Sequence, residues 1–105
     1  MQRQIAVAAL PDNPLDAGAA FMAFHLEAAR ALLADPATTA LAIVLPPAGH
    51  EHRDWRQALA RDLAREAAPK RVNVVAGAEG EAHAATLGFL ANAPGVTGHY
   101  LVCHE

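Results

Sequence analysis

The 105-residue sequence contains no serine and one cysteine, Cys103, and each shortage limits its chemistry. A single cysteine cannot form an internal disulfide and fits a reducing compartment, so we expect a cytoplasmic protein. Without serine there is no serine nucleophile for acyl transfer. No apolar run approaches the ~20 residues that span a membrane, and the apolar run near Met1 is too short for a signal peptide. We therefore expect no membrane association.

Basic residues are also scarce, and this bears on the possible partners. Eight lysines and arginines stand against eleven acidic residues, which gives a formal net charge of −3, and no basic run is present. A protein that neutralises a row of phosphates needs such a run, so nucleic acid is not an expected partner. Apolar residues make up 53% of the chain and charged residues only 18%. This balance predicts one folded domain over residues 1–105, and it predicts that part of the apolar surface lies at an interface between subunits.

Four short apolar segments alternate with three helical patterns. The predicted strands cover residues 4–10, 40–45, 72–76 and 99–103, and the predicted helices cover 15–34, 51–67 and 80–91. Strands that are apolar throughout are typical of buried parallel sheets. The sequence therefore predicts an α/β fold, a small Rossmann-like domain of four parallel strands with three crossover helices.

The spacing of apolar residues predicts which face each helix buries. The first helix has one stripe expected to face the sheet, made of Leu15, Ala19, Met22, Leu26, Ala29 and Leu33. A second stripe, which calls for another packing partner, consists of Phe21, Phe24, Ala28 and Leu32. In the second helix the residues expected inside are Trp55, Leu59 and Leu63, and those expected outside are Arg53, Asp54, Arg56, Arg61, Asp62, Arg65 and Glu66. The third helix is expected to bury Ala82, Ala85, Phe89 and Leu90.

The segment 71–102 reads RVNVVAG, then an alanine-rich helix ending in GFLANA, then PGVTGHYLV. This order resembles the closing strand, helix and strand of short-chain dehydrogenases/reductases. The resemblance covers residues 19–102 and only the C-terminal half of that fold, so we expect a truncated relative with strand order 1-2-3-4. Right-handed crossovers in that order would place every helix on one face. Either the third helix then crosses to the other face or another subunit covers it.

The resemblance also allows the family's chemistry to be sought position by position, and the chemistry is absent. No GxxxGxG or GxGxxG turn for a nicotinamide cofactor occurs, and the first strand instead runs into the residues 10–14, LPDNP. The family's catalytic asparagine, serine, tyrosine and lysine fall on His25, Ala48, Gly49 and Arg53. Alanine and glycine carry no proton to donate, so we expect a catalytically degenerate chain with no cofactor.

Three candidates for ligand binding contain histidine: His50-Glu51-His52, His104-Glu105 and His25. His50-Glu51-His52 contains zinc-ligand types, but two histidines two positions apart at a helix start point in divergent directions. A helix-capping, solvated role is the simpler interpretation, and we expect no metal. His104 and Glu105 could add ligands, although a frayed chain end is the simpler interpretation. His25 lies on an apolar helix, where a lone histidine is more often a hydrogen-bonded core or interface group than a functional one.

Two hypotheses follow from these observations. The first is a non-catalytic short-chain-dehydrogenase-like protein that acts through association, as a homodimer or as the partner of a complete dehydrogenase. The resemblance implies that the first two helices pair across a dimer axis, and the candidate contact residues are Phe21, Phe24, Leu32 and Trp55. The alternative is a small-ligand binding module, or a residual enzyme, with its site at the carboxyl ends of the strands. The pocket candidates are His25, Pro46, Pro47, His50 and Gly77.

Overall fold

A four-stranded parallel sheet runs through the middle of the molecule in a computed structural model that describes residues 1–103. The strands are β1 (Gln2–Ala6), β2 (Ala40–Leu45), β3 (Arg71–Ala76) and β4 (Tyr100–Val102). The helices are α1 (Pro14–Phe24), α2 (Leu26–Ala34), α3 (Arg53–Ala67), which follows the 3-10 turn η1 (His50–His52), and α4 (Glu81–Ala91). The strand order is β1-β2-β3-β4, and this confirms the predicted fold class and sheet order.

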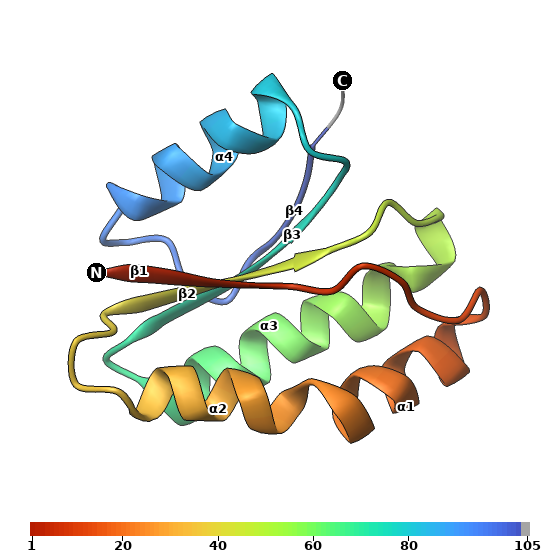
Figure 1. The fold of residues 1–105 in the computed structure, drawn as a ribbon, viewed down its shortest axis with the longest axis horizontal. Coiled ribbons are helices and arrows are strands. Elements are labelled where there is room, and N and C mark those ends of the chain that lie inside the picture. Colours follow the sequence, from red (N-terminus) through yellow and green to blue (C-terminus); the bar gives the residue numbers. More distant parts are fainter. Residues whose placement is uncertain (104–105) are drawn as a thin grey trace.

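The helices lie in two layers around this sheet. α1, α2 and α3 cover one face and α4 covers the other (Figure 1). The third predicted crossover therefore does pass to the second face, and its hand is opposite to that of the other two. The main core lies between the sheet and the layer of α1, α2 and α3. In the register of the sheet Ile5 lies beside Ile43, Ile43 beside Val74, and Val74 beside Tyr100, and all four belong to this core or pack against it.

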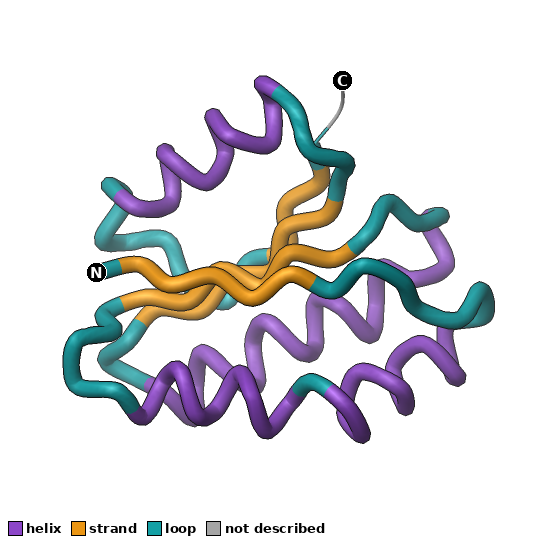
Figure 2. Tube along the Cα trace, viewed as in Figure 1, coloured by secondary structure: helices purple, strands orange, loops and turns teal. Residues whose placement is uncertain are grey.

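The first predicted helix is two helices, and this corrects the prediction of one helix over 15–34. The backbone leaves the helical region at His25 (φ −128°, ψ −22°), and α1 and α2 meet there at a bend of 46° (Figure 2). Among the described residues no single helix is long and apolar enough to cross a membrane, and α1 with α2 reaches that length and composition only as a bent pair.

The bend at His25 changes which apolar stripe faces the sheet. The predicted inward stripe holds in α2, where Ala29 and Leu33 are buried. It is wrong in α1, where Ala17 and Phe21 are buried instead, while Leu15 is 85% exposed. A stripe with a constant period of 3.6 residues assumes an unbroken helix. Because the helix is broken at His25, positions before and after the bend no longer share one face.

In α3 and α4 three side chains lie on the opposite side from the one predicted. Arg56, expected in solvent, is 1% exposed. Ala85 and Phe89, both expected inside, are exposed, Phe89 to 56%. In α4 the buried positions are His83 and Leu90. The first predicted strand is also displaced, because β1 covers Gln2–Ala6 and residues 7–10 belong to the loop that follows it.

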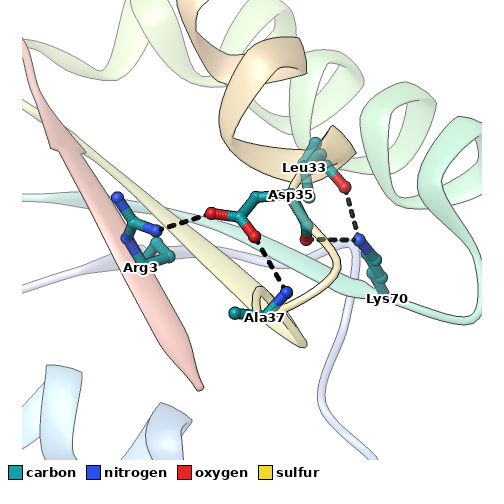
Figure 3. Close-up of polar contacts among 5 residues, drawn as sticks. All are labelled: Arg3, Leu33, Asp35, Ala37 and Lys70. Carbon is teal, nitrogen blue, oxygen red and sulfur yellow. Dashed lines mark hydrogen bonds and ion pairs between the residues drawn. The ribbon is translucent and has the colours of Figure 1, made fainter.

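The amino-terminal edge of the sheet is closed by polar contacts around Asp35, at the end of α2 (Figure 3). The Asp35 carboxylate accepts a hydrogen bond from Arg3 at 3.3 Å and one from the Ala37 amide at 2.9 Å. Lys70 Nζ donates to the main-chain carbonyls of Leu33 and Asp35, which end α2 without partners inside the helix. These contacts join β1, the end of α2 and the segment before β3, so the charged groups at this edge have structural partners. The search for a site therefore turns to the carboxyl ends of the strands.

Candidate functional site

A polar pocket of about 280 Å³ lies at the carboxyl ends of β1 and β2. We call it the strand-end pocket. Its walls come from the segments that leave the two strands, residues 10–12 and 46–49, from Glu51 and His52 in η1, and from Arg56 in the first turn of α3. In open α/β sheets ligands bind at this edge. This is also the edge to which the sequence analysis assigns its alternative, a small-ligand site.

Arg56 is the buried cation of this pocket. Its Nη1 donates to the Pro46 carbonyl at 2.9 Å and to the Tyr100 hydroxyl at 3.3 Å. Its guanidinium carbon lies 5.4 Å from the centroid of the Trp55 ring and 5.9 Å from that of the Tyr100 ring, within reach of cation–π attraction. Nε is buried and has no hydrogen-bond partner among the described residues.

His52 fastens the start of α3 to the loop after β1. Its Nε2 lies 2.7 Å from the Asp12 carbonyl oxygen, and its Nδ1 accepts the Trp55 indole N–H at 3.1 Å. Because Nδ1 is an acceptor, these partners assign the proton to Nε2, which donates to Asp12. His52 is buried, so within the HEH segment it is a structural group.

The structure brings together some of the predicted pocket residues and separates others. Pro46 and Pro47 line the strand-end pocket. His50 is exposed and outside the wall, and His25 lies at the bend between α1 and α2 with its ring 5.7 Å from that of Phe21. Within residues 1–103 no three histidine, cysteine or acidic side chains are placed to hold a metal ion, and His104 and Glu105 lie outside the described residues.

Sequence reasoning missed Arg56, although a signal for it exists. For His52 the prediction of a solvated helix start is wrong, because His52 is buried. Arg56 stands four residues before Ala60 and seven before Leu63, both buried, so it shares their face of α3. The charge of Arg56 alone predicts that it lies in solvent. Its position on the buried stripe of α3 is the sequence signal that indicates otherwise.

Gly77, the fifth predicted pocket residue, lies beside the chain end instead of in the pocket. Its φ is +148°, and a Cβ built there would lie 2.8 Å from Cys103 Cβ. We expect Gly77→Ala to destabilise the fold by about 1–3 kcal/mol, because alanine rarely adopts this conformation. Gly88→Ala is the matched control: Gly88 is in α4 with open space around it, and alanine there is expected to stabilise by up to about 1 kcal/mol. Equal urea midpoints for the two variants would contradict this account.

A second concavity, which we call the helix groove, lies between α1 and α3 and measures about 690 Å³. Its α1 wall carries Leu15, Gly18, Ala19 and Met22, and Trp55 lies beneath Gly18, with ring atoms 3.7 Å from the position of a Gly18 Cβ. The other wall residues are Pro14, Glu51, Asp54, Ala58, Leu59 and Asp62.

The four predicted contact residues occupy different environments. Phe21 is fully buried in the core, and Leu32 and Trp55 are half-buried against it. Trp55 also lines the helix groove. Phe24 is 78% exposed at the end of α1. Phe21 therefore belongs to the core of one chain, whereas Phe24 and Trp55 remain candidates for contact with another molecule.

A comparison with known protein families gives a match over nearly the whole chain. A family model described as short chain dehydrogenase-like protein matches residues 5–103. The chain belongs to this family. No curated protein and no solved structure gives a significant match.

The four positions that the sequence analysis assigns to the dehydrogenase tetrad do not line one pocket of this short chain dehydrogenase-like chain. Ala48 and Gly49 lie in the wall of the strand-end pocket, but His25 and Arg53 do not. Gly49 lies against the Glu51 carboxylate, which occupies the space that a larger side chain at position 49 would need. Neither Ala48 nor Gly49 carries a hydroxyl.

The turn after β1 does not fit the pyrophosphate of a nicotinamide cofactor. Such a turn offers backbone N–H groups at a helix N-terminus, but here two of the residues at 11–14 are prolines. The first turn of α1 is capped from within, since Asn13 Oδ1 accepts the Asp16 amide at 2.8 Å and Asn13 Nδ2 donates to the Asp16 carboxylate. That carboxylate would repel a phosphate.

Proposed function

We propose that this short chain dehydrogenase-like protein acts by binding another protein through the helix groove, and that it does not reduce or oxidise a substrate. The observation that supports this most directly is the groove itself, an apolar concavity between two helices on the surface. Leu15 is 85% and Met22 46% exposed on its α1 wall, and small residues, Gly18, Ala19 and Ala58, allow a close approach of backbones. Contiguous apolar surface of this kind marks interaction sites.

The charge of the groove favours a particular occupant. Its lining includes Glu51, Asp54 and Asp62, while the described lining residues include no lysine or arginine. Asp62 pairs with Arg65 at 3.5 Å, and Glu51 and Asp54 form none of the ion pairs among the described residues. α1 adds Asp16 and carries no basic residue. Two copies of the chain that met through this surface would bring acidic side chains together, which is unfavourable. The occupant that fits is an amphipathic helix of another protein, with an apolar stripe flanked by lysine or arginine.

The proposal that the chain is not a catalyst is based on the residues at the tetrad positions. Ketone reduction needs a hydroxyl that donates a proton and a lysine that lowers its pKa, and Gly49 and Arg53 stand at those two positions. The test is an assay of NADH and NADPH oxidation with carbonyl substrates and the pure full chain. No rate above that of a blank is expected, and steady turnover would overturn this part of the proposal.

The binding experiment uses two labelled helical peptides with the same leucine stripe, one flanked by lysine and one by glutamate, in fluorescence anisotropy with the full chain. The lysine peptide is expected to bind and the glutamate peptide to bind at least tenfold more weakly. Ala19→Trp, which fills the groove from an exposed position, is expected to weaken binding at least tenfold. Ala84→Trp, at an exposed position of α4 on the other face, is the control and is expected to have no effect.

Charge reversal and oligomeric state complete the test. Asp54→Lys with Asp62→Lys is expected to reverse the preference, so that the glutamate peptide binds more tightly. Sedimentation of the wild-type chain is expected to give a monomer of 11.0 kDa. A dimer that Ala19→Trp dissociates would identify a second copy as the occupant and overturn the heteromeric proposal. Equal binding of both peptides would also contradict it.

A further inference from the structure

The strand-end pocket contains a buried positive charge without a counter-ion. Residues 1–103 form three ion pairs, Arg3–Asp35, Arg30–Glu66 and Arg65–Asp62, and none of them includes Arg56. Arg56 is nevertheless 1% exposed, and its Nε has no hydrogen-bond partner among the described residues. A buried cation that is neither neutralised nor fully hydrogen-bonded is unfavourable. An anion bound in the pocket would supply both the charge and an acceptor.

The neighbours of Arg56 orient its side chain but do not neutralise it. The Pro46 carbonyl and the Tyr100 hydroxyl accept from Nη1, and the rings of Trp55 and Tyr100 lie beside the guanidinium carbon. All of these groups are uncharged. A guanidinium held in a fixed plane is suited to a planar carboxylate, which it can bind through two parallel N–H groups.

The opposite charge lies at the outer wall of the same pocket. Asp12 and Glu51 line it, both are exposed, and neither forms an ion pair with Arg56. These carboxylates would repel a ligand that is purely anionic and attract one that also carries a positive group. A volume of about 280 Å³ admits only a small molecule.

We propose that the strand-end pocket binds a small zwitterion of the amino-acid class, with its carboxylate on Arg56 and its ammonium group toward Asp12 and Glu51. This site differs from the helix groove because it contains a cation, Arg56, and takes a small molecule instead of a protein helix. Glu51 lines both cavities. It gives the chain a ligand-binding function that does not depend on dehydrogenase chemistry.

The experiment follows the Nε–H signal of Arg56 by ¹⁵N NMR in the full chain, together with calorimetry. The probes are free L-alanine, acetate, methylammonium and inorganic phosphate at one ionic strength. L-alanine is expected to bind saturably and to shift the Arg56 signal, acetate to bind at least tenfold more weakly, and the other two to give no saturable shift. Saturable phosphate binding tighter than that of L-alanine would overturn the zwitterion assignment, as would the absence of any L-alanine binding.

Four variants show whether binding occurs at this pocket. Arg56→Met is expected to weaken L-alanine binding at least tenfold, and Ala48→Phe, at an exposed loop position of the wall, is expected to do the same without disturbing the core. Asp12→Asn is expected to weaken L-alanine binding but not acetate binding. Arg53→Met, at an exposed arginine of α3 outside the pocket wall, is the control and should change neither. Unchanged L-alanine affinity in Ala48→Phe would place the ligand elsewhere and overturn the proposal.

Discussion

Phe21→Ala is expected to lower the free energy of unfolding by about 3–5 kcal/mol, because it removes a large buried ring and leaves a cavity. Phe21 is fully buried between α1 and the rest of the core, and its ring centroid lies 5.7 Å from that of His25 and 6.3 Å from that of Trp55. A small domain is stabilised by only about 5–15 kcal/mol, so this loss is a large part of the total. Urea unfolding followed by circular dichroism measures it.

Phe24→Ala is the matched control, because the same residue type stands three positions later on the same helix. Phe24 is 78% exposed, so its removal is expected to change the free energy of unfolding by no more than about 0.5 kcal/mol. A loss in Phe24→Ala as large as that in Phe21→Ala would show that another subunit buries Phe24 in solution. The pair of variants therefore separates the core of one chain from an obligate assembly.

The sheet could be predicted from the sequence because its strands have a simple pattern. Buried parallel strands are apolar at nearly every position, and β2 was predicted at its observed bounds, Ala40–Leu45. The strand order came from the resemblance of residues 71–102 to a family, since apolar runs alone do not specify which strands are neighbours. β1 was predicted too far along because residues 7–10 are also apolar, and Val7, just beyond β1, is buried in the core.

The helix faces and the site were harder to predict, for two physical reasons. No proline or glycine stands at the bend at His25, so the sequence carries no usual signal for it. The stripe of Leu15, Ala19 and Met22 before the bend is therefore predicted to face the sheet, although these three side chains are exposed. Arg56 was placed in solvent because arginine is rarely buried unless it is paired. Its burial depends on Tyr100 and the Pro46 carbonyl, which are distant in sequence and meet it only in the folded chain.

Asn73→Ala is expected to lower the free energy of unfolding by about 1–3 kcal/mol, because it removes two partly buried hydrogen bonds to main-chain groups. Asn73 is buried in β3, where its Nδ2 donates to the Val96 carbonyl at 3.0 Å and its Oδ1 accepts the His99 amide at 3.1 Å. These bonds hold the segment that leads into β4, a strand of only three residues. We therefore expect hydrogen exchange of the Tyr100–Val102 amides to increase more than exchange in β2.

Asn92→Ala is the control for this loss of an asparagine side chain. Asn92 Nδ2 donates to the Gly88 carbonyl at 3.0 Å, but the bond is exposed, so water can replace it. A change of no more than about 0.5 kcal/mol is expected, with exchange in β4 unaltered. If the two variants unfold at the same urea concentration, Asn73 does not anchor β4. If they differ as expected, the Arg56 site also depends on Asn73, since Tyr100 in β4 accepts a hydrogen bond from Arg56.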